Sequence, residues 1–267
     1  MIAREDWLAM PASPNLEILA GPEILLLGET GEAAELAAAL QAVDGCRLSR
    51  PRDLDLAAQD FTDIARLTEQ LSSRPVKLLV NAADPYEARL NDCALAAANA
   101  ADIQFLRVLR PAWKRDPLDS WIDVASVGAA ADICRWHGKR VLVTLAETDL
   151  AAFAGNDRCH FIVRLPQPPK QPLTLAHHDL LIGRDPFPWL DERRLMMEQQ
   201  VDLIVCRNSG GLDAYAKIDV ARDLAIPVVM IGRPPSPTQP QVDTIGQALT
   251  WIDAWCKTLN HNDGRPS

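Results

Sequence analysis

Short, uninterrupted apolar runs separated by helix-like segments constrain the fold of this chain more than any other feature. The clearest runs are EILLLG (23–28), VKLLVN (76–81), IQFLRVL (103–109), RVLVTLA (140–146), VDLIVCR (201–207) and IPVVMIGRP (226–234). They lack the in/out alternation of a strand that is exposed on one face, so both faces are expected to be buried. Strands of this kind with helices between them predict an α/β fold built on parallel sheets.

A proline-containing break, RPAWKRDPLDSW (110–121), divides the alternation into two series. We therefore predict two Rossmann-like parallel-sheet domains with a cleft between them. The second series is predicted to open on a helix within 119–136 and to close on a helix within 241–259. The expected boundaries are an N-terminal extension (1–22), a cofactor-binding domain (23–113), a second α/β domain (114–260) and a frayed tail (261–267).

Charge and hydropathy exclude several classes of function. The 267 residues carry a formal charge of −9, with a pI near 5.0, which disfavours nonspecific binding to nucleic acid. No apolar run reaches the roughly 18 residues of a membrane span. The N-terminus lacks the basic start and apolar core of a signal peptide, so a cytoplasmic location is predicted.

The cysteines and histidines do not indicate a metal site. None of the six cysteines stands at Cys-x-x-Cys spacing and several lie inside apolar runs, so reduced core thiols are predicted. His177 and His178 are adjacent, and adjacent side chains diverge in a strand. No third ligand is evident beside them, so no metal is expected.

The first predicted strand is followed by a turn that suits an anion. Ligands of open parallel sheets bind beyond the carboxyl ends of the strands. Here that place holds the turn into a helix, where backbone amides and the helix dipole favour negative charge. The turn lacks the full Gly-x-Gly-x-x-Gly pattern of a dinucleotide site. The cofactor contacts predicted in it are Gly28, Thr30, Gly31 and Glu32.

Arginines around the second predicted strand, CRLSR (46–50), indicate which dinucleotide is bound. The end of this strand meets the adenosine ribose in dinucleotide folds, and arginine there suits a 2′-phosphate. Arg47 and Arg50 are the expected contacts, with Arg52 close by. NADPH is therefore predicted as the cofactor in preference to NADH.

Basic residues recur at the remaining strand ends. Each one alone could cap a helix or pair with a carboxylate. Their recurrence in a chain of charge −9 predicts a polyanionic ligand in the cleft. The loop CRNSGG (206–211) adds glycine backbone that can approach a ligand closely. The substrate contacts predicted from these strand ends are Arg110, Lys114, Arg184, Arg207, Asn208, Ser209, Gly210, Gly211 and Arg233.

Several segments, in this order, resemble the precorrin-6A reductases of cobalamin biosynthesis. They are ILLLGETGEAAELAAAL, NAADPYEARLNDCA, LRVLRPAW, KRVLVTLA and, most specifically, VCRNSGGLDAYAKIDVARDLAIPVVMIGRP. The resemblance implies two Rossmann-like domains and NADPH-dependent reduction of a double bond in a polycarboxylate tetrapyrrole, precorrin-6A or its cobalt-containing counterpart. It also adds Lys217 to the expected substrate contacts, and suggests hand-over contacts with neighbouring pathway enzymes.

The chain departs from the family pattern in the cofactor half. Glu29 stands where the family has the second glycine of Gly-Gly-Thr, and Asp84 replaces a histidine. Two alternatives therefore stay open: a tetrapyrrole-binding relative that has lost reduction, and an NAD(P)-dependent reductase of another polycarboxylate. Tyr86 and Ser209, or water, are the candidate proton donors.

Overall fold

A computed structural model describes residues 22–41, 46–51, 61, 63–237 and 239–262. They form two compact units. Unit 1 comprises the described residues up to Ala83, Arg89–Val108 and the described residues from 239 onward; unit 2 comprises Asp84–Ala88 and Leu109–Pro237. Each unit is built on its own all-parallel sheet, so the predicted α/β fold is confirmed.

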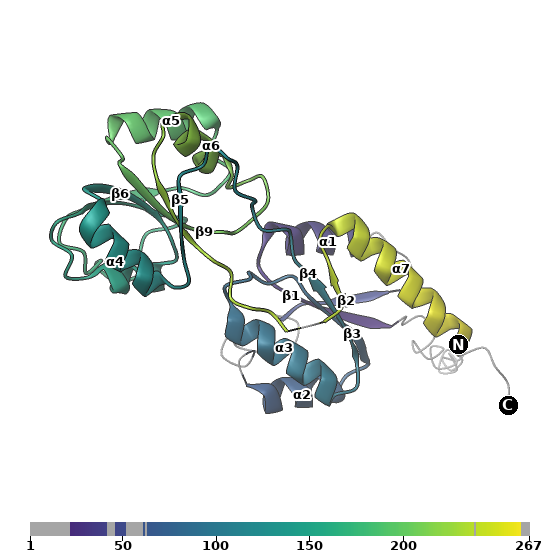
Figure 1. The fold of residues 1–267 in the computed structure, drawn as a ribbon. Helices are drawn as coiled ribbons and strands as arrows, with labels where there is room; N and C mark the ends of the chain where they lie inside the picture. The colour runs from purple at the N-terminus through teal and green to yellow at the C-terminus, as the bar shows by residue number, and fades with distance from the viewer. Residues whose placement is uncertain (1–21, 42–45, 52–60, 62, 238, 263–267) are drawn as a thin grey trace, which may run out of the picture. The chain divides into compact units, whose positions relative to one another are not determined.

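The sheet of unit 1 has the strand order β11-β4-β3-β1-β2. Its strands are β1 (Glu23–Leu27), β2 (Arg47–Ser49), β3 (Val76–Asn81), β4 (Gln104–Val108) and β11 (Gln241–Val242). Helices cover both faces (Figure 1): α1 (Gly31–Gln41) and α7 (Ile245–Asn262) one of them, α2 (Ile64–Ser72) and α3 (Ala88–Ala100) the other.

The continuous apolar runs of unit 1 follow from this double coverage. Successive side chains of a strand point to opposite faces. Ile24 and Leu26 of β1 therefore pack with α1 and α7, whereas Leu25 and Leu27 pack with α2 and α3. Burying each such side chain contributes about 1.5–3 kcal/mol, so an alternating polar residue would be costly here.

The C-terminal helix belongs to unit 1, which differs from the expected boundary at 260. After unit 2 the chain returns through β11, whose Val242 pairs with Val108 of β4. The apolar stripe of α7 then packs in the same buried cluster as α1 and β1, through Ala248, Ile252 and Trp255. The expected assignment followed chain order, whereas the apolar face of α7 follows the sheet that it covers.

The sheet of unit 2 has the order β5-β10-β9-β6-β7-β8. Its strands are β5 (Trp121–Val124), β6 (Arg140–Thr144), β7 (His160–Leu165), β8 (His178–Ile182), β9 (Leu203–Arg207) and β10 (Val228–Ile231). One face is covered by α4 (Val127–His137) and the 3₁₀ helix η3 (Glu147–Phe153), the other by α5 (Trp189–Glu198) and α6 (Ala216–Asp223).

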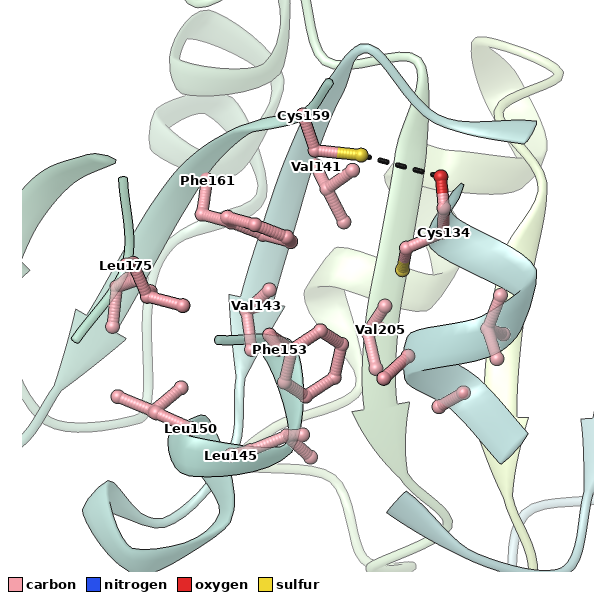
Figure 2. Close-up of a cluster of buried hydrophobic side chains, with 14 of the residues drawn as sticks. Cys134, Val141, Val143, Leu145, Leu150, Phe153, Cys159, Phe161, Leu175 and Val205 are labelled. Atoms are coloured by element: carbon pink, nitrogen blue, oxygen red, sulfur yellow. Dashed lines mark hydrogen bonds between the residues drawn. The ribbon is translucent and has the colours of Figure 1, made fainter. Parts of the chain in front are cut away.

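Two aromatic rings lie at the centre of the α4 and η3 face. Phe153 of η3 meets Phe161 of β7 edge-on, with ring centroids 5.6 Å apart (Figure 2). The Cys159 thiol in the same cluster donates to the carbonyl of Cys134. These contacts pack α4 and η3 against this face of the sheet.

The helix predicted over 119–136 is divided in the structure. Residues 121–124 form strand β5, and the helix begins only after Ser126, whose side chain accepts a hydrogen bond from the amide of Ala129. β5 is an edge strand with half-exposed side chains, so it lacks the continuous apolar run of a central strand.

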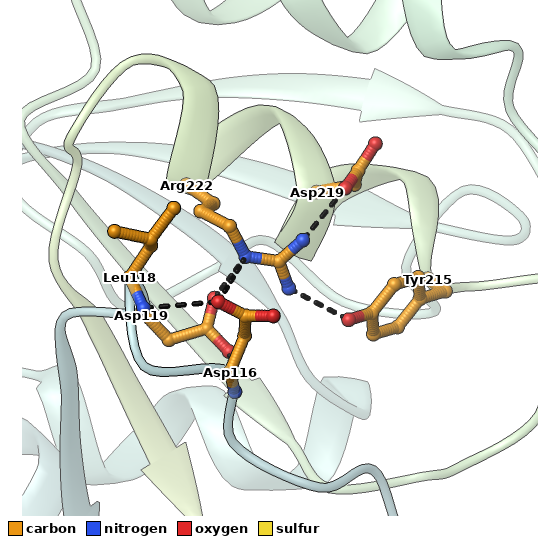
Figure 3. A network of polar contacts seen from close by, with 6 residues as sticks. All are labelled: Asp116, Leu118, Asp119, Tyr215, Asp219 and Arg222. Atoms are coloured by element: carbon orange, nitrogen blue, oxygen red, sulfur yellow. Dashed lines mark hydrogen bonds and ion pairs between the residues drawn. The ribbon is translucent and has the colours of Figure 1, made fainter.

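A charged network holds the segment before β5 against α6 (Figure 3). Arg222 donates to Asp119, Asp219 and the hydroxyl of Tyr215, at distances of 2.7–2.8 Å. The side chain of Asp119 is only 1% exposed, and its ion pair with Arg222 compensates for the loss of water around it. These bonds to Asp119 and Tyr215 raise the pKa of the guanidinium.

Candidate functional site

Strand order places one topological switch point in each sheet. In unit 1 the strands run outward in opposite directions from β1 and β3, and in unit 2 from β6 and β9. Ligands of open α/β sheets bind beyond the carboxyl ends of the strands at such points. The residues that follow these four strands therefore form the candidate site of each unit.

In unit 1 the turn after β1 is fixed by Gly28. Its φ is +119°, and a Cβ at this position would lie 2.6 Å from the backbone of Ala82, just after β3. The Thr30 hydroxyl donates to the Ala82 carbonyl (2.8 Å) and accepts from the amide of Ala33 (3.1 Å). Thr30 thus caps α1 and ties the turn to β3, a structural use of a residue predicted to contact the cofactor.

The amino end of α1 is open above Gly31. This residue is exposed, and a Cβ added to it would meet no described atom within 4 Å. Glu32 lies in the first turn, where its carboxylate is favourable to the helix dipole but unfavourable to a bound anion. The side chain of Glu29 is exposed.

The arginines of the second strand lie at different edges of the sheet. Arg50 follows β2 and donates to the carbonyl of Ala33 (3.0 Å), so its guanidinium lies beside the first turn of α1. Arg47 is instead the first residue of β2. In the strand register it lies opposite Glu23, the first residue of β1. Arg47 therefore lies at the amino edge of the sheet, and not with Arg50 at the carboxyl end of the strand, where both were expected to contact the cofactor. Arg52 falls outside the described residues.

A buried arginine that was not among the predicted site residues supports this site. Arg107 of β4 is 1% exposed and donates to the carbonyls of Asn81 (3.2 Å) and Ala83 (2.9 Å). It thereby fixes the carboxyl end of β3 opposite Gly28. A lone charge inside the apolar run IQFLRVL was the available signal.

In unit 2, two buried polar atoms lie at the switch point without a partner among the described residues. They are Nε of Arg207, which ends β9, and Oγ1 of Thr144, which ends β6 beside Cys206. The rest of the Arg207 guanidinium donates to Asp149 (2.7 Å) and stacks 4.6 Å from the ring centre of Tyr86. Buried polar atoms are nearly always hydrogen-bonded, so two unsatisfied atoms distinguish this edge from the rest of the sheet.

The loop that follows β9 is held by the segment 110–113. Arg110 donates to the carbonyl of Ser209 (2.9 Å). Asn208 accepts from the amide of Trp113 (2.7 Å) and donates to its carbonyl (3.1 Å), and the Trp113 indole donates to the carbonyl of Gly211 (2.6 Å). Trp113 was not among the predicted site residues.

The two glycines of CRNSGG allow the loop to lie close to the segment 110–113. Gly210 has φ +73°, and a Cβ there would lie 2.1 Å from the carbonyl oxygen of Pro111. Gly211 has φ +74°, with its Cβ position 2.9 Å from Cδ of Arg110. The close backbone approach that was predicted for a ligand is made in unit 2 by the chain itself.

Arg233 is also engaged by the backbone. Its three guanidinium nitrogens donate to the carbonyls of Asn208 (2.9 Å), Arg110 (2.8 Å) and Ser209 (2.7 Å). Burial lowers the pKa of Arg233. The residue joins the ends of β9 and β10 to the 110–113 segment, so it shapes the site.

The two candidate proton donors are both near Arg207. The Tyr86 hydroxyl donates to the carbonyl of Ile231 (2.7 Å), and burial raises the pKa of Tyr86 to about 12. The Ser209 hydroxyl makes a longer contact, 3.4 Å, with the carbonyl of Arg207. Tyr86 is therefore a poor acid near neutral pH, and Ser209 is the less constrained hydroxyl.

Three further predicted substrate contacts take no part in the hydrogen bonds that join the loop after β9 to Arg233 and the segment 110–113. Lys114 and Arg184 are exposed, and Arg184 follows β8 at the edge of the sheet. Lys217 is 3% exposed and donates to the carbonyl of Ala214 (2.9 Å), so its ammonium group is not available to a ligand in solvent.

Within the described residues, no cluster of three or more His, Cys, Asp or Glu side chains is arranged to hold a metal ion.

No helix in the part of the chain that the structure describes is long and apolar enough to cross a membrane.

Comparisons with known proteins identify the family. Residues 23–253 match the family model "Precorrin-6x reductase CbiJ/CobK". A precorrin-6A reductase of Rhodococcus erythropolis is 36% identical over 240 residues, 86% of this chain and 96% of the relative. One from a Sinorhizobium species is 30% identical over 88% of this chain and 94% of the relative.

A solved structure gives the same result for the fold. The structure described as CobK precorrin-6A reductase aligns with a TM-score of 0.76 at 25% identity, over 87% of this chain and 96% of that one. The chain therefore belongs to the precorrin-6x reductase CbiJ/CobK family.

Proposed function

We propose that this chain reduces a double bond of the precorrin-6A macrocycle, with NADPH as the hydride donor. The match of residues 23–253 to the precorrin-6x reductase family, together with the precorrin-6A reductase that is 36% identical over 240 residues, carries the proposal. The chemistry of the two strand edges supports it, because one suits a phosphate and the other a carboxylate or carbonyl oxygen. When bound, the nicotinamide would supply the hydride, and the chain would supply binding, orientation and a proton.

The carboxyl edge of β1 and β3 fits a dinucleotide. Gly28 brings the turn against the end of β3, and the amino end of α1 is open above Gly31. Backbone amides there suit the pyrophosphate. The Arg50 guanidinium lies beside the same helical turn, through its bond to Ala33, and is our candidate for the 2′-phosphate. Arg50 is thus the basis for proposing NADPH over NADH.

The carboxyl edge of β6 and β9 fits an oxygen of the substrate. Nε of Arg207 is a donor, and the Thr144 hydroxyl can donate or accept. Asp149 and Tyr86 hold the guanidinium from other directions, which fixes where its remaining N–H points. We therefore propose Arg207 and Thr144 as substrate contacts. We propose that Arg110 and Arg233 position the loop that follows β9.

Cofactor choice can be tested with a matched pair of arginine variants. Loss of a charge-assisted contact costs about 1.5–3 kcal/mol, or roughly 10- to 100-fold in affinity. We expect Arg50→Ala to raise the KM for NADPH by about that factor and to leave the KM for NADH unchanged. Arg47→Ala, at the opposite edge of the sheet, should leave both unchanged. Equal effects of the two variants would contradict the assignment.

Activity with precorrin-6A separates the remaining alternatives. The purified chain is titrated with NADPH and with NADH, and nicotinamide and macrocycle absorbance are then followed after addition of precorrin-6A or its cobalt form. Macrocycle binding without turnover would identify a relative that has lost reduction. Cofactor binding with no response to either macrocycle would indicate another polycarboxylate substrate. Hand-over contacts with pathway enzymes and a cytoplasmic location stay predictions.

The substrate edge can be tested with Thr144→Val, which removes a hydroxyl and keeps the shape. We expect the KM for the macrocycle to rise about 5-fold or more, consistent with one lost hydrogen bond. Because Oγ1 has no partner among the described residues, the folded chain should not lose stability. Unchanged kinetics with a gain in stability would show that Thr144 contacts no substrate.

The proton donor is tested separately. Removing a general acid costs roughly 10²–10⁴-fold in rate. Because Tyr86 holds its proton to a pKa of about 12, we expect Tyr86→Phe to lose less than about 10-fold in kcat. Ser209→Ala tests the other hydroxyl. A loss of 10²-fold or more in Tyr86→Phe alone would restore Tyr86 as the donor.

A further inference from the structure

Two cysteines of unit 1 lie in direct contact although they are far apart in sequence. Cys46, just before β2, and Cys256, in α7, have their Sγ atoms 3.0 Å apart and are 210 residues apart along the chain. Both are half-buried and pack against the cluster that joins α1, β1 and α7. The contact therefore lies within unit 1.

The other four cysteines have different surroundings. Cys93, Cys134, Cys159 and Cys206 are each at most 3% exposed. The Cys159 thiol donates to main-chain carbonyls, and Cys206 contacts the sulfur of Met230 at 3.9 Å. Among the described cysteines, only the pair in unit 1 joins a sulfur–sulfur contact to partial exposure, which an oxidant needs to reach it.

We propose that Cys46 and Cys256 form a reversible disulfide when the chain meets a peroxide. Cys46 gives up its thiol proton and attacks a peroxide oxygen; a sulfenic acid forms, and the second oxygen leaves with that proton as water. Burial and the contact with Cys46 raise the pKa of Cys256 to about 12, so Cys256 acts as the second thiol. The second thiol then attacks the sulfenic sulfur and releases a second water as the S–S bond forms. The two thiols lose two electrons and two protons, and hydrogen peroxide is reduced to two waters. The sulfur atoms need to approach by only about 1 Å to reach bonding distance.

The disulfide would join the N-terminal part of unit 1 to its C-terminal helix α7. The chain leaves this unit after Val108 and returns only from 239 onward, so α7 is otherwise held by packing and by β11. A covalent link from the start of β2 to α7 restricts the unfolded chain over a long loop, which is where a disulfide stabilises most. Cys46 precedes the amino end of β2, away from Gly28, so the bond should leave the carboxyl edge of the sheet undisturbed.

The direct test is peptide mapping of the full chain. The reduced protein is treated with a small excess of hydrogen peroxide, digested without reductant and analysed by mass. We expect a peptide linking Cys46 to Cys256, lighter than its reduced parts by two hydrogens and released by dithiothreitol. Folded protein that yields only sulfinic acid on one cysteine, a Cys134–Cys159 link or a link between two chains would overturn the proposal.

Thermal unfolding supplies an independent readout. The oxidised wild type should melt about 5 °C above the reduced form, and reductant should reverse the gain. Cys46→Ala and Cys256→Ala should each lose both the linked peptide and the gain. Cys93→Ala, a matched variant outside the pair, should keep both. These readouts are independent of reductase activity, so the redox proposal and the proposed function can fail separately.

Discussion

At the scale of single residues, Tyr86 has its acid–base chemistry set by burial. Its pKa is raised to about 12 from 10.0, chiefly by burial, although Arg233 and Arg207 oppose the shift. The folded state therefore holds the proton more tightly than the unfolded state does. The resulting stability is complete below pH 10 and is lost as the pH rises from 10 to about 12.

We expect Tyr86→Phe to flatten this alkaline loss of stability. Urea unfolding at several values between pH 9 and pH 12 measures the slope in the wild type and the variant. The chain has only two tyrosines, so an ultraviolet titration can assign the late ionisation. It should disappear in Tyr86→Phe and persist in Tyr215→Phe. Equal slopes in wild type and Tyr86→Phe would contradict the burial argument.

Gly210 lies where the loop leaves no room for a side chain. Alanine there would place Cβ 2.1 Å from the carbonyl oxygen of Pro111 at a positive φ. We expect Gly210→Ala to lower the free energy of unfolding by about 2 kcal/mol or more. Gly246→Ala is the matched control, because Gly246 is an exposed residue near the start of α7 and a Cβ there meets no described atom within 4 Å. This substitution should stabilise the chain by up to about 1 kcal/mol. Similar effects of the two substitutions would contradict the close packing of the loop.

At the scale of elements, prediction succeeds where a signal is local. The run VKLLVN is strand β3 at the expected residues, because burial on both faces demands an unbroken apolar stretch. β5 contains Asp123 and lies at an edge, so its pattern is weak. β11 has only two residues and exists through its pairing with β4.

The site follows the same rule. The turn at Gly28 and the arginines at strand ends could be read from sequence because each follows an apolar run. The partners of Arg207 could not, because Asp149 and Tyr86 reach it from distant segments. Likewise, the role of Gly210 depends on Pro111, which the fold brings to it across about a hundred residues.

Helix α7 contributes its apolar face to the core of unit 1. Ile252 is 2% exposed in the cluster shared with α1 and β1. Truncating a buried isoleucine costs about 2–5 kcal/mol, so Ile252→Ala should speed amide exchange across unit 1. Thr250→Ala on the exposed face of the same helix should change stability by less than about 0.5 kcal/mol. Faster exchange confined to unit 2 would show that α7 does not stabilise unit 1.

At the scale of the whole molecule, one chain forms two units, and each unit has a core of its own. Unit 1 is assembled from segments that flank unit 2, and each sheet carries its own pair of buried clusters. A ligand stabilises the state that binds it, by about 2.7 kcal/mol at a concentration 100 times its Kd. A cofactor held at the β1 and β3 edge should therefore stabilise unit 1 selectively.

Hydrogen exchange with and without NADPH tests this selectivity. We expect the slowest amides of β1 and β3 to exchange about 100-fold more slowly at that NADPH concentration, whereas β7 and β8 of unit 2 stay within about 2-fold. Arg50→Ala should lose most of the protection at the same concentration, and Arg47→Ala should keep it. If β7 and β8 were protected and β1 and β3 were not, the dinucleotide site would have to be reassigned to the carboxyl edge of unit 2. The assignment of Arg207 and Thr144 to the substrate would then fall with it, because the same buried atoms at the β6 and β9 edge would be serving the cofactor.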